Sequence, residues 1–159
     1  MTLVGIGFDS HRLTAGRKLL IGGVEIPFEL GLDGHSDADV LAHAVTDALL
    51  GACGKEDIGE RFPDTDERWR DADSMEMLSS VVENLLTEGL EIVNVDCTVV
   101  IEAPKLSPHR QAIRDRLAEV LRLEVTRVNV KASTGEGMGF VGRGEGVAAL
   151  AIAGVRAGG

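Results

Sequence analysis

Residues 147–155 read VAALAIAGV, a stretch without a single charged or hydrogen-bonding side chain. The run follows the Gly-rich segment 135–146 and predicts a β-strand that is apolar on both faces. Such a strand is expected to be buried on both faces. In a chain of only 159 residues, we therefore expect a second subunit to cover one side of this strand.

Two segments near the N-terminus also have strand or hairpin patterns. Met1–His11 has a period of two, so its side chains point alternately to opposite faces. One face carries Val4, Ile6 and Phe8, and the other carries Gly5, Gly7, Asp9 and His11. Lys18–Pro27 predicts a hairpin that turns at Gly22-Gly23.

Two more strands are expected between these segments and residue 147. Ile92–Glu102 alternates, and Val128–Ala132 is a short apolar strand. The apolar face of the first is expected to comprise Val93, Val95, Cys97, Val99 and Ile101.

Three helices are expected between the strands. Ser36 has Asp39 three residues later and Asp73 has Glu76, as in capping boxes, and Pro108 suits a first helical turn. The expected helices run from after Ser36 to about Cys53, from Asp73 to Gly89, and from Ser107 to about Leu123. Residues 54–72 are expected to form a loop. The sequence thus predicts one α/β (α+β) domain, residues 1–159, with helices stacked on a mixed β-sheet.

The composition excludes several classes of function. The net charge is −10 and aromatic residues make up only 3%, so a basic, stacking surface for nucleic acid is not expected. No apolar run approaches the roughly 18 residues of a membrane helix, and no signal peptide is recognisable. We therefore expect a cytoplasmic protein that binds neither nucleic acid nor membranes. Cys53 and Cys97 form no CxxC pair and are expected to be buried free thiols.

Asp9-x-His11 places a carboxylate and an imidazole on one strand face, roughly 6.5–7 Å apart along the backbone. His43 belongs to the only polar stripe of an otherwise apolar helix, in a row with Asp39 and Asp47. A helix packed on this strand could supply His43 as a third ligand, which leaves a tetrahedral position open as in catalytic zinc sites. Two plainer interpretations remain open: a strand that ends in a turn, and a hydrogen-bonded core histidine.

The Gly-rich segment contains two further patterns. Gly137-x-Gly139-x-x-Gly142 matches a dinucleotide fingerprint, but it leads into a strand and no helix is expected there, so we reject it. Residues 133–136 offer hydroxyls, backbone amides and one carboxylate, which suit phosphate oxygens and a hard cation, although an ordinary hairpin has the same composition. Arg143 is either an anion ligand or paired within its own turn.

Eight segments, in this order, resemble one enzyme family over essentially the whole chain. They are GFDSHRL, IGGVEIP, GHSDADVLAHAVTDALLGA, DIGERFPDTD, DADS, EAPKLSPH, NVKAST and GFVGRGEG. HSDADVLAHA together with FPDTD is highly specific for the 2-C-methyl-D-erythritol 2,4-cyclodiphosphate synthases. The resemblance implies a homotrimer with active sites between subunits. It also implies conversion of 4-diphosphocytidyl-2-C-methyl-D-erythritol 2-phosphate to the cyclodiphosphate and CMP, in non-mevalonate isoprenoid biosynthesis.

The resemblance also assigns roles to individual residues. It implies one Zn²⁺ per subunit on Asp9, His11 and His43, and a second cation, Mg²⁺ or Mn²⁺, on Glu136. The implied catalytic residues, which stabilise the transition state, are His35 and Thr134. The implied substrate-binding residues are Ser36, Asp57, Ile58, Gly59, Phe62, Pro63, Asp64, Thr65, Asp66, Ile101, Glu102, Ala103, Pro104, Lys105, Leu106, Ser107, Ser133, Gly135, Phe140 and Arg143.

Within that set the resemblance distinguishes four parts of the site. Residues 57–59 would contact the ribose, 62–66 the methylerythritol phosphate, and 101–107 the cytosine. Phe140 and Arg143 would lie between the substrate and the trimer axis. The sequence departs from the family at Gly135, Gly137 and Leu106-Ser107, where hydroxyl, Lys and Met-Leu residues are common.

Two other functions are compatible with the same residues. A metal-dependent nucleotide hydrolase would use the same ions with water as the nucleophile. A non-catalytic trimeric binding protein would use zinc only as a structural staple, although an open coordination position argues against it. The chain has no second, nucleotidyltransferase domain, so a monofunctional enzyme is expected.

Overall fold

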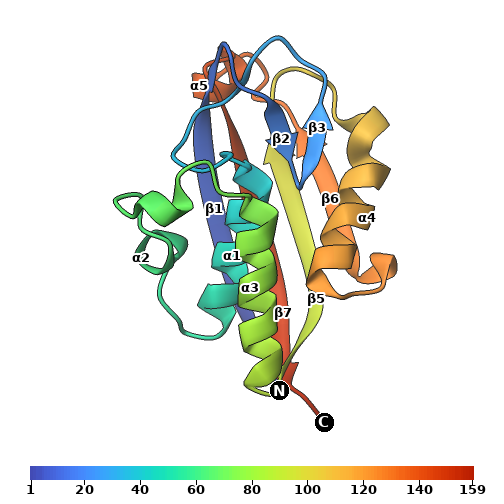
Figure 1. Cartoon of the computed structure of the whole chain (residues 1–159). Helices are drawn as coiled ribbons and strands as arrows, with labels where there is room; N and C mark the ends of the chain where they lie inside the picture. Colours follow the sequence, from blue (N-terminus) through green and yellow to red (C-terminus); the bar gives the residue numbers. More distant parts are fainter.

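A computed structural model describes residues 1–159, and its main feature is a five-stranded sheet (Figure 1). The order of the strands in this sheet is β4-β1-β7-β5-β6. The strands are β1 (Thr2–Thr14), β4 (Gly31–Leu32), β5 (Leu90–Val100), β6 (Val128–Ser133) and β7 (Gly146–Ala157). β5 and β6 are parallel and the other neighbours are antiparallel, which confirms the expected mixed sheet.

Helices cover one face of this sheet: α1 packs on β1 and β7, α3 packs beside α1 and against β5, and α4 lies beside β6 (Figure 1). The helices are α1 (Val40–Ala52), α2 (Ile58–Arg61), α3 (Ser74–Thr87), α4 (Arg110–Leu121) and α5 (Gly139–Gly142). The expected hairpin is confirmed as β2 (Leu19–Ile21) and β3 (Val24–Ile26), a separate two-stranded sheet. One continuous apolar core lies between the helices and the large sheet. None of the helices has the length and apolar character that a membrane span requires.

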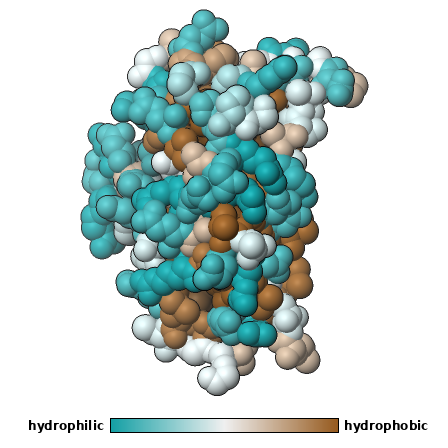
Figure 2. Space-filling view, turned by 90° about the vertical axis from the view of Figure 1, so that its right-hand side faces the viewer, coloured by the Kyte–Doolittle hydropathy of each residue, from teal (hydrophilic) through white to brown (hydrophobic).

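The outer face of the sheet is apolar and uncovered. Ile6 of β1 lies opposite Ile152 of β7, and their exposed fractions are 68% and 48%. Val4, Phe8 and Leu150 on the same face are also exposed. Figure 2, a side view, shows apolar atoms along its right-hand edge, on the side of the sheet away from α1 and α3. Within the single chain the helices bury only one face of residues 147–155, so burial of the other face by a second subunit stays a prediction.

Helix α1 begins later than expected, since Asp39 and not Ser36 is its N-cap. Ala38 has a positive φ of 58°, a left-handed conformation that a helix cannot include. The fully buried Asp39 carboxylate accepts hydrogen bonds from the backbone amides of Gly22, Gly23 and Ala42. Burial raises the pKa of Asp39, and these amides act against that rise. Asp39 thus joins the β2–β3 turn to the start of α1.

Residues 54–72 are not a plain loop. Asp57 caps α2 by accepting from the amide of Glu60, and Asp66 caps a 3-10 turn, Glu67–Trp69, by accepting from the amide of Arg68. Elements this short have too few residues to give a periodic sequence signal. The third expected helix likewise begins as a 3-10 turn, Ser107–His109, before α4.

Two smaller expectations also need correction. The register of β5 against β7 shifts between Ile92 and Asn94, so Ile92 is buried and Val93 is only half-buried. A bulge of this kind breaks the strict alternation that the sequence suggests. Cys97 is buried, and burial raises the pKa of its thiol to about 12, but Cys53 is only half-buried.

Helix α1 lies directly on the backbone of β1. A Cβ atom on Gly7 would be 1.9 Å from the carbonyl oxygen of Ala44, and one on Gly5 would be 2.0 Å from that of Ala48. Any side chain at these two positions would push the helix away from the strand. The two glycines therefore let α1 lie close along β1, so that His43 in the first turn of the helix reaches the polar end of the same strand face.

Candidate active site

Three side chains meet where α1 crosses β1. Asp9 and His11 point from the inner face of β1, and His43 points toward them from the first turn of α1. Oδ2 of Asp9 lies 2.8 Å from Nε2 of His11 and 3.0 Å from Nδ1 of His43. The two ring nitrogens lie 3.2 Å apart. The structure thus confirms that these residues, widely separated in sequence, converge at one point.

The geometry of this cluster fits a divalent metal ion. In a tetrahedral zinc site with bonds of about 2.0–2.1 Å, neighbouring ligand atoms lie roughly 3.3 Å apart. The three separations of 2.8, 3.0 and 3.2 Å are within about half an ångström of that value. One carboxylate and two imidazoles are also a donor set that zinc accepts, with a fourth position left for a substrate.

Hydrogen bonds behind His11 orient it toward this cluster. Its Nδ1 donates to the carbonyl oxygen of Asp33 at 2.8 Å, because a carbonyl can only accept, so Nε2 faces Asp9. Burial by itself would raise the pKa of Asp9, but its close contacts with His11 and His43, together with the positive charge that these rings can carry, outweigh burial and hold that pKa at about 2. Burial lowers the pKa of His11, yet the bond and charge of Asp9 raise it overall. The cluster is therefore strongly biased toward an ionised Asp9 that holds a cationic partner.

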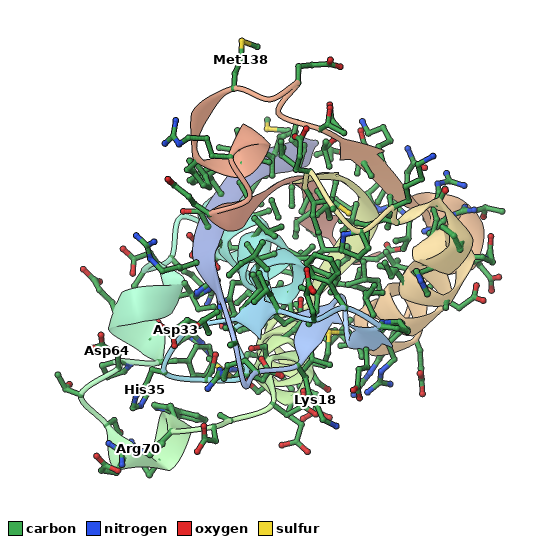
Figure 3. The ribbon with its side chains drawn as sticks, turned by 90° about the horizontal axis from the view of Figure 1, so that it is seen from above. Lys18, Asp33, His35, Asp64, Arg70 and Met138 are labelled. Carbon is green, nitrogen blue, oxygen red and sulfur yellow. The ribbon has the colours of Figure 1, made fainter.

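A cavity of about 400 Å³ opens beside the cluster. It brings together the metal-ligand candidates with members of the expected ribose and methylerythritol-phosphate segments. Its lining comprises Asp9, His11, His35, Ser36, His43, Ile58, Gly59, Phe62, Asp64, Trp69 and Met77. The view from above shows His35 and Asp64 on the same flank of the molecule (Figure 3). A cavity of this size with convergent polar groups is typical of a small-molecule site.

Other expected site residues lie in a separate pocket of about 190 Å³. This pocket is lined by Ile101, Glu102, Pro104, Lys105, Leu106, Ser107, Ala132, Ser133 and Thr134. It shares no residue with the larger cavity, and β7 lies between β1 and the strand β5 that leads to it. Glu136 lines neither, and Met138, two residues beyond it, lies across the molecule from His35 (Figure 3). A single chain therefore keeps His35 and Thr134 apart.

The Gly-rich segment has its own internal packing. A Cβ atom on Gly135 would lie 2.6 Å from the amide nitrogen of Gly142, so the tight turn here excludes the side chain that the family pattern suggests. The amide of Gly135 donates to Glu102 at 2.9 Å. Arg143 forms an ion pair with Glu145 at 3.1 Å, so in the single chain it is paired within its own turn. The side chain of Phe140 is 41% exposed.

A short helix, α5 (Gly139–Gly142), does form inside the glycine fingerprint, contrary to expectation. Two backbone hydrogen bonds hold this turn together: the amide of Gly142 donates to the carbonyl of Met138, and the amide of Arg143 donates to the carbonyl of Gly139. A dinucleotide site is still rejected, because such a site needs a long helix that begins at the glycine motif. Here the motif leads instead into the strand β7.

Sequence reasoning missed four residues of the site. Trp69 and Met77 line the large cavity, and the ring of Trp69 packs edge-on against Phe62 with centroids 4.9 Å apart. Asp37 and Ser74 form hydrogen bonds behind His43. Two features of the sequence could have indicated them. Trp69 is the only Trp of the chain and follows FPDTD closely, and Ser74 ends the DADS segment of the family pattern.

Comparisons with known proteins agree with this geometry. The profile of the YgbB family matches residues 2–156. A 2-C-methyl-D-erythritol 2,4-cyclodiphosphate synthase of Treponema denticola is 54% identical over 147 residues, which are 92% of this chain and 91% of that protein.

Two solved structures are also close. The bifunctional IspDF of Campylobacter jejuni is 44% identical with a TM-score of 0.95, over 99% of this chain and 42% of that one. A 2C-methyl-D-erythritol-2,4-cyclodiphosphate synthase in its CDP-bound form is 38% identical with a TM-score of 0.88, over 96% of this chain and 99% of that one. The chain belongs to the YgbB family, the family of the 2-C-methyl-D-erythritol 2,4-cyclodiphosphate synthases.

Proposed function

We propose that this protein converts 4-diphosphocytidyl-2-C-methyl-D-erythritol 2-phosphate to 2-C-methyl-D-erythritol 2,4-cyclodiphosphate and CMP, in non-mevalonate isoprenoid biosynthesis. The observation that carries the proposal is the meeting of Asp9, His11 and His43 at the edge of a 400 Å³ cavity. Family membership and the names of the relatives support the same activity.

The reaction needs no nucleophile from the protein. The 2-phosphate of the substrate is already an anion, and one of its oxygens forms a bond to the β-phosphorus of the diphosphate. The bond between that phosphorus and the bridging oxygen breaks, and CMP leaves with the electron pair. The main obstacle is repulsion between phosphates on a protein whose net charge is −10. Zn²⁺ on Asp9, His11 and His43, and Mg²⁺ or Mn²⁺ on Glu136, would offset that charge and polarise the phosphates when bound.

Residues of the cavity would orient the substrate and donate hydrogen bonds to it. Nε2 of His35 is 3.4 Å from the carbonyl oxygen of Asp66, a long contact that leaves the ring able to turn and donate to a phosphate. Phe62 and Trp69 form an apolar wall that suits the carbon skeleton of methylerythritol. Holding both ends of one bent substrate supplies a positioning effect of up to about 7–11 kcal/mol in favourable intramolecular systems.

A homotrimer would complete this site from two copies of the chain. One substrate must reach both the metal cluster and a cytosine pocket, yet a single chain carries these in two separate pockets. The exposed apolar face of β1 and β7 offers a surface that a second and third copy would bury. In this arrangement Thr134 and Lys105 of one copy would face His35 and His43 of its neighbour.

Reaction in ¹⁸O-water tests this proposal against the hydrolase alternative. Because every product oxygen would come from the substrate, CMP and the cyclic product should both be unlabelled. A metal-activated water would instead place one ¹⁸O in CMP or in a linear phosphate. A labelled linear product would show that the protein is a hydrolase. Bound zinc without any turnover would favour a binding protein in which zinc has only a structural role.

A further inference from the structure

Ser74 lies between His43 and Asp37 and contacts both. It is the first residue of α3 and is fully buried. Its Oγ is 2.8 Å from Nε2 of His43, on the side of the ring away from Asp9. The same hydroxyl donates to Oδ1 of Asp37, and the amide of Ser74 donates to Oδ2 of Asp37 at 3.1 Å. Asp37 therefore binds both polar groups of Ser74.

These contacts fix the direction of the hydrogen bonds. A hydroxyl has one hydrogen, and Ser74 gives it to the carboxylate of Asp37, which only accepts. The oxygen of Ser74 must then accept from His43, so the proton of a neutral His43 ring lies on Nε2. Nδ1 is left with a free lone pair that faces Asp9 and His11. This is the protonation form that a metal-binding Nδ1 requires.

Helix capping does not explain the hydroxyl of Ser74. The N-cap of α3 is Asp73, whose carboxylate accepts from the amide of Met75 at 2.8 Å. A buried hydroxyl that caps nothing has been desolvated, which is unfavourable unless it hydrogen-bonds. Its partners are a ligand of the metal cluster and a carboxylate, the arrangement found behind metal-binding histidines.

We propose that Ser74, held by Asp37, is a positioning residue that fixes the Nε2–H form and the ring orientation of His43, and so presents Nδ1 to zinc. The inference rests on the proposed zinc site. The same logic holds for His11, whose Nδ1–H is bound by the carbonyl of Asp33. Backbone positions one ligand, and the Ser74–Asp37 pair positions the other.

The test compares Ser74→Ala with Ser80→Ala as its matched control. Ser80 lies on the same helix, and its hydroxyl donates to the carbonyl of Met77, away from the cluster. We expect Ser74→Ala to weaken zinc binding about 10–100-fold in competition with a chelator, and Ser80→Ala to leave it unchanged. In zinc-free protein with a neutral His43 ring, ¹⁵N NMR of the imidazole should show Nε2–H in the wild type and a loss of that preference in Ser74→Ala.

Asp37→Asn provides a second variant in case Ser74→Ala does not fold. Its amide can donate to Ser74, which reverses the chain of hydrogen bonds, and we expect the same weakening and the same NMR change. Wild-type zinc affinity together with an unchanged Nε2–H signal in either folded variant would overturn the role of Ser74 and leave the proposed function intact. A wild-type protein that binds no zinc would instead overturn the zinc site itself.

Discussion

Nδ1 of His43 lies 3.0 Å from Oδ2 of Asp9, although 34 positions separate the two residues in the chain. The contact exists because α1 lies on the glycine backbone of β1. We expect the purified protein to hold about one zinc per chain. His43→Ala should remove that zinc and lower activity by roughly 1,000-fold or more while the fold persists.

Metal analysis, activity and circular dichroism of the same His43→Ala sample check this expectation. His109→Ala is the control, since His109 lies outside the cluster and should keep its zinc. Full zinc occupancy in His43→Ala would remove His43 from the site.

The close approach of α1 to β1 predicts opposite effects for two Gly→Ala substitutions. Gly7→Ala would place a Cβ 1.9 Å from the carbonyl oxygen of Ala44, so we expect a loss of more than about 3 kcal/mol of stability, and a loss of zinc. Gly51→Ala in α1 meets nothing closer than 3.7 Å and should stabilise the protein by roughly 0.5–1 kcal/mol through helix propensity. Denaturant unfolding measures both, and equal stability of the two variants would contradict the packing described above.

The exposed sheet face predicts that one buried charge should break the assembly. We expect the wild type to sediment at about 50 kDa, three times the 16.8 kDa of one chain. Ile152→Glu should sediment as a monomer and lose activity, because Ile152 lies in the centre of the apolar face. Leu86→Glu is the control, since Leu86 is 40% exposed but belongs to α3 on the other side of the molecule. A stable, active wild-type monomer at micromolar concentration would rule out sites shared between copies.

The Asp9–His11 pair predicts how the stability of the zinc-free protein changes with pH. The pKa of Asp9 falls from its ordinary 3.8 to about 2 on folding. Its contribution to the free energy of unfolding is therefore full above pH 3.8 and is lost as the pH falls toward 2. The pKa of His11 is raised from 6.5, so its contribution is full below pH 6.5 and is lost as the pH rises through the raised value. Both contributions coexist between about pH 4 and pH 6.5.

Thermal unfolding in the presence of a chelator, from pH 3 to pH 9, checks this window. Asp9→Asn should lose on the order of 2 kcal/mol of stability relative to the wild type inside the window. This loss should shrink as the pH falls toward 2, where Asp9 itself is protonated, and as the pH rises through the raised pKa of His11, where Asp9 no longer faces a charged ring. A difference that does not vary with pH would show that the pair is not ionic.

The sequence alone determined the features that repeat along the chain. The alternation in β1 placed Asp9 and His11 on the face of Gly5 and Gly7, because successive side chains of a strand point to opposite faces. Helical spacing and capping residues located α1, α3 and α4 to within a few residues. The family motifs pointed to Asp9, His11 and His43 as candidate metal ligands, and the structure brings these three side chains together.

Only the tertiary structure decided the relations between elements. The 3.0 Å contact between Asp9 and His43 depends on how deeply α1 lies on β1, which no local pattern encodes. The exposure of Ile6 and Ile152 depends on which face of the sheet the helices cover. The contact of Ser74 with His43 exists because the N-terminus of α3 packs beside α1. Local periodicity fixes the direction in which a side chain points, whereas long-range packing selects the partner that it meets.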